Sequence, residues 1–430
     1  MRGFARISIF IALFMLLVPA AFATSEKPLE AVSEGTKIIE NVAAAAVYNI
    51  ENDTVVFSYH ADDAAVTGSL TKLMTAVCAY ELLQDRLDEK ITVTSDMVKG
   101  MTMNFYGYKA GNEVVVRDMF GGMLARGYND CAHILACLAK GSVEGFVAYM
   151  NEKAAEWGMK NTVYVNATGL DKDGMTTTAS DSLIVARKFY EIPFLTSISN
   201  SMNYEGEVNF SNRNEFLLKG DYFDSDIIAM NYGWTANSLS CAASATEGEG
   251  LSYIIVVLGG QNVDSKDFAY LVTSYLADKA LSEFGYVDVI KKGKVVCEVP
   301  VELSIDADYV TLVGADSLTL YLPLSVDIST DLVYSYRLSS EKLTAPVTEG
   351  QIVGSYTVSR DGVILGSVDL VTKNSLGRSE FLKVLDSIEK FTTSTFFIVT
   401  LIALVVLTIA YFVVGAIVRH RRRNRRLGRR

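Results

Sequence analysis

An uncharged apolar run near the C-terminus, residues 396–418, constrains this chain most. In a helix that rises about 1.5 Å per residue, its 23 residues cover the roughly 30 Å hydrocarbon layer of a membrane. Eight arginines follow within residues 419–430, and such a flank favours the cytoplasmic side. We predict a transmembrane helix over 395–418, a cytoplasmic tail over 419–430 and the rest of the chain outside. A basic segment beside a span contacts anionic lipid, so we expect no nucleic-acid partner.

The N-terminus has the pattern of an export signal. Arg2 and Arg6 precede an apolar run over residues 7–20, and Ala21-Phe22-Ala23 forms a small-x-small cleavage site. The alternative is a retained anchor, but this run is shorter than the roughly 20 residues that a span needs. We predict a signal peptide over residues 1–23.

The region between the two ends is acidic and has no visible metal site. When the ten arginines of the two ends are left out, the chain contains 29 basic and 50 acidic residues. This negative net charge disfavours polyanionic partners. The cysteines are odd in number and form no CxxC pair, so buried free thiols are expected rather than a disulfide framework. The three histidines lack metal-ligand spacing, and we expect neither a metal nor a cofactor. The cysteines are Cys78, Cys131, Cys137, Cys241 and Cys297.

Periodicity predicts an α+β domain over residues 24–283. Two strands, Ala44 to Ile50 and Thr54 to Tyr59, flank turn residues and indicate a hairpin. Helical spacing follows from Ser69 to about Leu83, which puts Ser69 at a helix N-terminus. Further helices are expected over 115–124, 130–140, 143–157 and 181–190, followed by an apolar strand over 253–258. Strands, helices and a returning strand are typical of an α+β fold.

A second pattern begins after this domain. Short alternating runs over 295–301, 317–322 and 352–358, separated by turn residues, predict a small all-β domain over 284–372. Residues 373–394 are mixed and charged with apolar positions at helical spacing, so we expect a juxtamembrane linker helix there.

Ser69 and Lys72 form a candidate acyl-transfer pair. A serine needs a neighbouring base to become nucleophilic, and a lysine three residues later lies on the same helix face. The lysine can act as that base only if burial or a nearby cation lowers its pKa. The spacing alone is weak, because it recurs at Ser339 to Lys342 and at Ser387 to Lys390.

The residues around the first pair carry a specific resemblance. Thr67-Gly68-Ser69-Leu70-Thr71-Lys72-Leu73-Met74-Thr75-Ala76 resembles the active-site segment of the D-alanyl-D-alanine carboxypeptidases, the low-molecular-mass penicillin-binding proteins. The resemblance continues in chain order through Gly111-Asn112-Glu113, 146–170, Thr178-Ala179-Ser180-Asp181, Asn212-Arg213-Asn214, 293–301, Ala345-Pro346-Val347 and 350–354.

This resemblance implies a fold and an activity. The fold is a penicillin-binding/β-lactamase-like transpeptidase domain, an antiparallel sheet with a helical subdomain, followed by the family's small β-domain. The activity is removal of the terminal D-alanine from peptidoglycan stem peptides through an acyl-Ser69. The expected partners are therefore these peptides, β-lactams as covalent ligands of the serine, and the membrane through the C-terminal helix.

Two motifs depart from the family pattern. The second motif, Ser-x-Asn, is here Gly127-Tyr128-Asn129, which retains the substrate-positioning Asn129 but lacks the serine hydroxyl. The third motif, Lys-Thr-Gly, is here Asn231-Tyr232-Gly233, which lacks the cation that binds the substrate carboxylate. In an alternative interpretation, Tyr128 replaces the missing serine as the acid that relays a proton to the leaving group.

The remaining substrate-binding expectations follow from the same resemblance. It implies an oxyanion hole from the backbone N–H groups of Ser69 and Trp234, which side-chain changes leave intact. Arg213 is predicted to supply a residual cation to the pocket. The predicted catalytic residues are Ser69, Lys72 and Asn129, and the predicted substrate-binding residues are Asn231, Gly233, Trp234, Thr235 and Arg213.

Three functions fit this combination. The first is a working serine carboxypeptidase of weak or altered activity, which the intact Ser69 and Lys72 favour. The second is a non-catalytic wall-binding or regulatory protein, which the changed second and third motifs favour. The third is an acyl-transferring enzyme for a substrate without a free carboxylate, in a pocket that Tyr232 and Trp234 make more aromatic.

Overall fold

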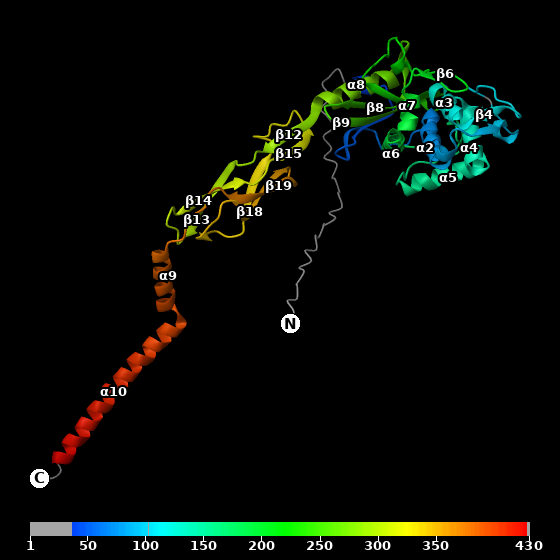
Figure 1. Cartoon of the computed structure of the whole chain (residues 1–430). Helices are drawn as coiled ribbons and strands as arrows, with labels where there is room; N and C mark the ends of the chain where they lie inside the picture. The colour runs from blue at the N-terminus through cyan, green and yellow to red at the C-terminus, as the bar shows by residue number, and fades with distance from the viewer. Residues whose placement is uncertain (1–36, 102, 428–430) are drawn as a thin grey trace, which may run out of the picture. The chain divides into compact units, whose positions relative to one another are not determined.

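The structure, a computed structural model, describes residues 37–101 and 103–427, with side chains to residue 421 (Figure 1). The predicted signal peptide therefore lies outside the described residues. The chain divides into two units, Met1–Ser282 and Glu283–Arg430, and each is described here by itself.

The first unit is built on a five-stranded antiparallel sheet in the order β2-β1-β9-β8-β7. The predicted hairpin is confirmed as β1 and β2, with Val47 opposite Phe57, and β7 lies at the other edge. The strands are β1 (Ala44–Asn49), β2 (Thr54–Tyr59), β7 (Ile227–Thr235), β8 (Leu239–Gly248) and β9 (Leu251–Gly260). Two-residue and three-residue strands pair outside it: β3 (Lys90–Thr92), β4 (Glu113–Val115), β5 (Asn203–Tyr204), β6 (Phe210–Ser211), β10 (Asn262–Val263) and β11 (Lys266–Asp267).

Helices pack on both faces of this sheet. One face contributes Ile254, Val256 and Leu258 to a core that it shares with α2 and its neighbours. On the other face, Tyr270 of α8 stacks on Tyr232 of β7. The α-helices are α2 (Thr71–Leu83), α3 (Val116–Arg126), α4 (Asn129–Lys140), α5 (Val143–Glu156), α6 (Ala179–Tyr190), α7 (Pro193–Ser199) and α8 (Phe268–Glu283). The 3-10 turns are η1 (Gly68–Leu70), η2 (Gln84–Arg86), η3 (Asp96–Val98) and η4 (Glu215–Leu217).

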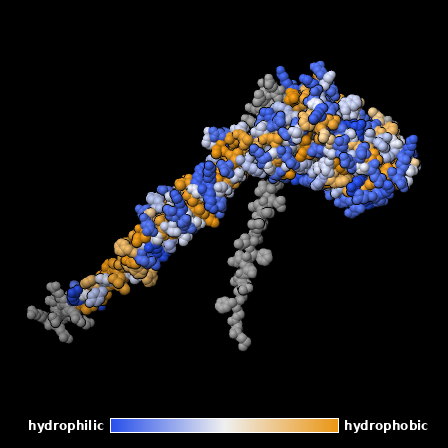
Figure 2. Space-filling model, turned by 45° about the horizontal axis from the view of Figure 1, so that its top comes forward, coloured by the Kyte–Doolittle hydropathy of each residue, from blue (hydrophilic) through white to orange (hydrophobic). Residues whose placement is uncertain are grey.

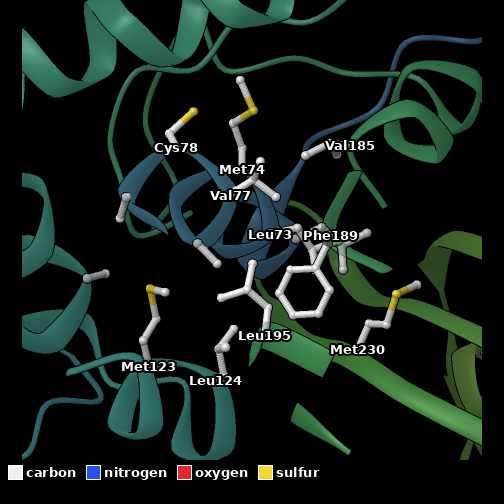
Figure 3. Close-up of a cluster of buried hydrophobic side chains, with 14 of the residues drawn as sticks. Leu73, Met74, Val77, Cys78, Met123, Leu124, Val185, Phe189, Leu195 and Met230 are labelled. Carbon is white, nitrogen blue, oxygen red and sulfur yellow. The ribbon is translucent and has the colours of Figure 1, made fainter. Parts of the chain in front are cut away.

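Helix α2 lies at the centre of the first unit. Leu73 and Met74 have no exposed surface, and Figure 3 shows them among side chains from several elements, including Phe189, Leu195 and Met230. The helix packs against α4 and α6. Because the helix is surrounded by packed side chains, the residues at its start are held in place with it.

Local sequence determines where the neighbouring helices begin and end. The Thr178 side chain caps α6 by accepting a hydrogen bond from the Asp181 N–H at 3.0 Å, and Ser142 caps α5 in the same way. Helix α3 ends at Gly127, whose φ of +70° is a left-handed conformation that glycine adopts without strain. This cap sets the position of the Gly127-Tyr128-Asn129 segment.

The second unit contains the predicted all-β domain. A six-stranded sheet has the order β16-β18-β19-β14-β13-β17, and β12 pairs with β15. Ile290, Leu312 and Val358 lie in its core without exposed surface. The strands are β12 (Phe284–Ile290), β13 (Val295–Glu302), β14 (Tyr309–Gly314), β15 (Leu318–Pro323), β16 (Val333–Leu338), β17 (Leu343–Thr344), β18 (Ile352–Arg360) and β19 (Val363–Thr372).

Two helices follow the β-domain, α9 (Glu380–Thr393) and α10 (Thr395–Leu427). Ser379 caps α9. Thr395–Arg421 is long and apolar enough to cross a membrane, with a mean hydropathy of 2.9 in its most apolar window. Figure 2 shows apolar side chains gathered along this helix. Its length and composition are compatible with the predicted membrane anchor.

Replacing Leu73 with alanine should destabilise the first unit. The side chain is fully buried, so Leu73→Ala is expected to reduce the free energy of unfolding by roughly 2–5 kcal/mol. The matched control is Leu218→Ala, because Leu218 is 37% exposed and its truncation should cost much less. Chemical unfolding of the purified chain measures both values. Equal losses in the two variants would contradict the central position of α2.

Candidate active site

Ser69 lies in η1, immediately before α2, and its side chain contacts the edge strand β7. A Cβ added to Gly233 would lie 2.1 Å from the Ser69 Cβ and 2.3 Å from its Oγ. Only a glycine therefore allows the strand to approach the serine this closely. The neighbouring Asn231 Nδ2 donates a hydrogen bond to the Ser69 carbonyl oxygen at 2.9 Å. The structure thus brings Ser69, Asn231 and Gly233 together.

Lys72 follows one helical turn after Ser69 and is buried, with 3% of its surface exposed. Its Nζ donates a hydrogen bond to the Thr168 carbonyl oxygen at 2.5 Å. Burial, and secondarily the positive charge of Arg213, lower the pKa of Lys72 from 10.5 to about 7. A large fraction of this lysine is therefore neutral near neutral pH, as a general base must be.

Residues 166–170 form a loop that rests on the start of α2. Thr75 Oγ1 donates to the Ala167 carbonyl at 2.7 Å, next to the Lys72 contact with Thr168. The Asn166 side chain holds the turn by accepting hydrogen bonds from the Thr168 and Gly169 N–H groups. Gly169 has a φ of +77°, and a Cβ there would lie 1.8 Å from the Gly68 carbonyl oxygen. The loop position therefore requires glycine.

Asn129 is the first residue of α4, and it is buried. Its Nδ2 donates to the Met103 carbonyl oxygen at 2.6 Å, and its backbone N–H donates to the Asn104 carbonyl at 2.8 Å. Its Oδ1 is buried and accepts no hydrogen bond within the described residues. An unsatisfied buried acceptor is costly, which is typical of a functional position.

The neighbours of Asn129 organise the loop before α3. The Asp130 carboxylate accepts hydrogen bonds from the backbone N–H groups of Tyr106, Gly107 and Tyr108, at 2.9–3.2 Å. The Tyr128 ring packs against those of Tyr106 and Phe210, with centroid separations of 5.8 and 5.9 Å. Tyr128 therefore has a packing role on the surface of this segment.

The aromatic residues of the third motif lie away from the Ser69 side of β7. The Tyr232 ring stacks on Tyr270 at 4.3 Å, and its hydroxyl donates to the Asp267 carboxylate. Side chains alternate along a strand, so Asn231 and Gly233 occupy the other face. Tyr232 nevertheless borders the small cavity beside Asn231, and its contribution to an aromatic pocket stays a prediction. Trp234 shares the Tyr232 face by the same alternation, and it is 55% exposed.

Thr235, at the end of β7, contacts the loop that follows residue 170. Its Oγ1 donates to Asp171 Oδ1 at 2.6 Å, and the other Asp171 oxygen accepts from the Asn237 N–H at 3.1 Å. Thr235 Oγ1 also lies 2.8 Å from Ser238 Oγ. Asp171 therefore ties the end of the edge strand to the loop that carries Thr168.

Arg213 lies beside Gly127. A Cβ on Gly127 would lie 2.4 Å from one terminal nitrogen of the Arg213 guanidinium. Both residues line a cavity of about 10 Å³, enough for one water molecule, together with Asn231 and Asn214. Burial lowers the pKa of the guanidinium below its usual value. Within the described residues the Arg213 side chain makes no hydrogen bond or ion pair.

The other two serine–lysine pairs have different surroundings. Lys342 forms an ion pair with Glu302 at 2.5 Å, and Lys390 forms one with Asp386 at 2.7 Å. Both lysines are exposed, and the Glu302 carboxylate raises the pKa of Lys342. Of the three pairs, Ser69 and Lys72 alone combine burial with a lowered lysine pKa, so the other two matches in spacing are coincidental.

Several residues that shape the site were not predicted. The Thr168 carbonyl and the Asp171 carboxylate act on Lys72 and Thr235 from a loop distant in sequence, so no local pattern identified their roles. The signal that could have pointed to them was Gly169 within the family-like segment 146–170. The described residues hold no cluster of side chains suited to a metal ion.

Two family models match the chain. One, described as D-alanyl-D-alanine carboxypeptidase, matches residues 32–262. The other, described as the C-terminal domain of penicillin-binding protein 5, matches residues 284–378. The first match lies in the first unit and the second in the second unit.

Individual relatives match over most of their length. The chain is 24% identical to the D-alanyl-D-alanine carboxypeptidase DacF of Bacillus subtilis, over 87% of this chain and 94% of that protein. It is 26% identical to DacC of Escherichia coli, over 89% and 93% respectively. Among solved structures, the carboxypeptidase DacD of Francisella tularensis is similar in fold, with a TM-score of 0.58, 20% identity and coverage of 79% of this chain and 94% of that one.

A substitution at Gly169 should lower the thermal stability more than a substitution that adds backbone strain alone. Gly169→Ala adds both a strained φ and an overlap with the Gly68 carbonyl, so it should lower the thermal midpoint substantially. Gly158→Ala is the matched control, since Gly158 has a φ of +83° but open space around it. Thermal unfolding of both variants compares them. Equal midpoints would mean that the loop does not rest on η1 as described.

Proposed function

This chain belongs to the D-alanyl-D-alanine carboxypeptidase family, and from that premise we propose that Ser69 attacks the terminal D-Ala-D-Ala bond of peptidoglycan stem peptides. The observation that carries the proposal is the buried Lys72, one turn after Ser69, with a pKa of about 7. A lysine in this state can take the serine proton and return it to the leaving group.

The proposed reaction runs in two steps. Neutral Lys72 takes the proton of the Ser69 hydroxyl as Oγ bonds to the peptide carbonyl carbon, and the resulting ammonium then protonates the departing D-alanine nitrogen as the C–N bond breaks. A water molecule attacks the acyl-serine in the second step, with Lys72 again accepting a proton. Since Gly127 has no hydroxyl, the proton reaches the leaving group from Lys72 itself.

Backbone groups are proposed to stabilise the tetrahedral intermediate. The N–H groups of Ser69 and Trp234 serve as the oxyanion hole, and the close approach of Gly233 to Ser69 supports this assignment. Asn129 is proposed to hold the substrate amide, using the buried Oδ1 that lacks a partner within the described residues. Asn231, Thr235 and Arg213 are proposed to border the pocket for the terminal D-alanine.

We also propose an extracytoplasmic location for the first unit. The signal-like N-terminus would direct export, and α10 would anchor the chain, with residues 419–430 on the cytoplasmic side. β-Lactams, which resemble the D-Ala-D-Ala terminus, are proposed covalent ligands of Ser69.

A non-catalytic wall-binding protein is the second candidate function. The observation that favours it is the loss of both the second-motif hydroxyl, at Gly127, and the third-motif cation, at Asn231. Such a protein would retain the cleft and bind stem peptides without releasing D-alanine. The two functions differ in turnover, which can be measured.

A labelled penicillin tests the nucleophile. The purified chain should gain one adduct, located on Ser69 by mass spectrometry, and should release D-alanine from a D-Ala-D-Ala peptide. Ser69→Ala should lose both activities, whereas Ser339→Ala, in a pair of the same spacing, should retain them. An adduct without D-alanine release would favour the wall-binding candidate. Absence of any Ser69-dependent adduct would refute the enzyme proposal.

The acylation rate should depend on the protonation of Lys72. Burial lowers its pKa to about 7, so acylation should be slow below that pH, where the ammonium cannot accept a proton, and should rise as pH increases through it. Stopped-flow acylation by penicillin from about pH 5 to about pH 9 measures this profile. Lys72→Arg, which stays protonated throughout, should remove the rise. A flat profile in the wild-type chain would exclude Lys72 as the base.

A further inference from the structure

We infer that Asp267 is a positioning residue for the oxyanion hole, because its carboxylate ties β7 to β8 around Trp234 and thereby fixes the Trp234 N–H beside Ser69. This inference deepens the proposed function and rests on it, since Trp234 is the proposed oxyanion donor. It also gives a role to Tyr232, which stands in the place of the motif threonine. The Tyr232 hydroxyl is the group through which β7 is attached to Asp267.

The end of β7 needs an anchor because the sheet holds it on one side only. β7 is an edge strand of the five-stranded sheet, and among the described strands it pairs with β8 alone. The register of this pairing shifts at residues 229–231, directly before the segment that faces Ser69. The register between β8 and β9 shifts at residues 240–242, opposite the same segment. Such bulges bend a strand and interrupt its ladder, so the ladder alone does not fix residues 231–235.

The Asp267 carboxylate reaches both strands at this point. Its Oδ2 accepts hydrogen bonds from the Tyr232 hydroxyl of β7 and from Ser240 Oγ of β8, the latter at 2.8 Å. Tyr232 lies two residues before Trp234, and Ser240 is the residue that pairs with Trp234 across the two strands. One charged group therefore holds the neighbours of Trp234 on both strands. Hydrogen bonds to a charged acceptor are stronger than those between neutral groups.

Asp267 is itself held at the start of α8. It is 6% exposed, and its second oxygen, Oδ1, accepts a hydrogen bond from the Ala269 N–H at 2.9 Å, in the manner of a helix N-cap. Its own N–H donates to the Tyr222 hydroxyl at 2.6 Å. A buried carboxylate is costly unless its oxygens accept hydrogen bonds, and both oxygens do so here. The anchor therefore has one end on α8 and the other on the sheet.

The Tyr232 ring has little freedom to move away from this anchor. It stacks on Tyr270 at 4.3 Å, and Tyr270 stacks in turn on Tyr222 at 4.9 Å. Burial and the hydrogen bond to Asp267 raise the pKa of Tyr232 above its usual value, so the hydroxyl stays a donor at neutral pH. Ring and hydroxyl together restrain the strand from the face opposite Ser69.

The Ser69 face of the strand offers less restraint. There, Asn231 Nδ2 donates to the Ser69 carbonyl oxygen at 2.9 Å, and the next residue on this face is Gly233, which has no side chain. Glycine is also the residue with the widest conformational freedom. An oxyanion hole depends on donors that are in place before the charge develops. A looser Trp234 N–H should therefore slow acylation and leave the initial binding of a ligand unchanged.

Stopped-flow acylation of the full-length chain by penicillin tests the inference, because its concentration dependence separates initial binding from the acylation step. Tyr232→Phe keeps the stacked ring and removes only the hydroxyl. It should lower the acylation rate constant roughly 10-fold, less than the loss of about 100- to 1,000-fold for a deleted oxyanion donor, because the Trp234 N–H is still present. The initial binding constant should stay unchanged.

Tyr190→Phe is the matched control. The Tyr190 hydroxyl also donates to a carboxylate, that of Glu247, but at the other end of β8, so this variant should keep the wild-type rate constant. Asp267→Asn should slow acylation like Tyr232→Phe, and the double variant should be little slower than either single one, because both changes remove the same hydrogen bond. Rates are measured per Ser69 adduct formed, so unfolded protein does not contribute to them.

The outcomes separate this inference from the proposed function. If the wild-type chain forms no Ser69 adduct, the proposed function fails and this inference fails with it. If the wild-type chain reacts, the inference alone fails on any of three results: wild-type acylation in Tyr232→Phe, an equal loss in Tyr190→Phe, or additive losses in the double variant. A lower thermal midpoint without a slower acylation step would show a packing role only and would also overturn it. Slower acylation with unchanged binding supports both.

Discussion

The burial of one lysine is the constraint on which the rest of the site depends. An ammonium group loses its hydration inside a protein, so a lysine at the centre of a packed domain is stabilised in its neutral form. The chain accommodates Lys72 with a carbonyl from the 166–170 loop and with a neighbouring cation, and no described carboxylate pairs with it. The same packing that secures α2 therefore lowers the pKa of the lysine beside Ser69.

The site is assembled by close backbone approaches that glycines permit. Gly233 brings the edge strand against the serine, and Gly169 brings the loop against the turn before α2. Asp171 then connects that loop to the strand end through Thr235 and Asn237. Backbone contacts and side-chain hydrogen bonds thus hold Ser69, Lys72 and the end of β7 in a fixed arrangement.

Sequence periodicity predicted the elements that local pattern controls. The first hairpin and the β-domain of the second unit depend on alternation and turn residues, the helix after Ser69 depends on helical spacing, and all three are observed. Ser69 with Lys72 was identifiable because the residues around the pair resemble a family segment, whereas the spacing alone recurs at two other places in the chain. The position of the Arg213 guanidinium beside Gly127 and the direction of the Tyr232 ring depend on tertiary packing, so no window of sequence contained them.

The contact between Gly169 and η1 has a consequence for how such a sequence can change over time. A side chain at position 169 would meet the Gly68 carbonyl oxygen, a backbone atom that cannot move without shifting the turn that carries Ser69. At Gly127, an added Cβ would meet only the flexible end of the Arg213 side chain. Both glycines have a left-handed φ, but position 169 is therefore the less free of the two to diverge.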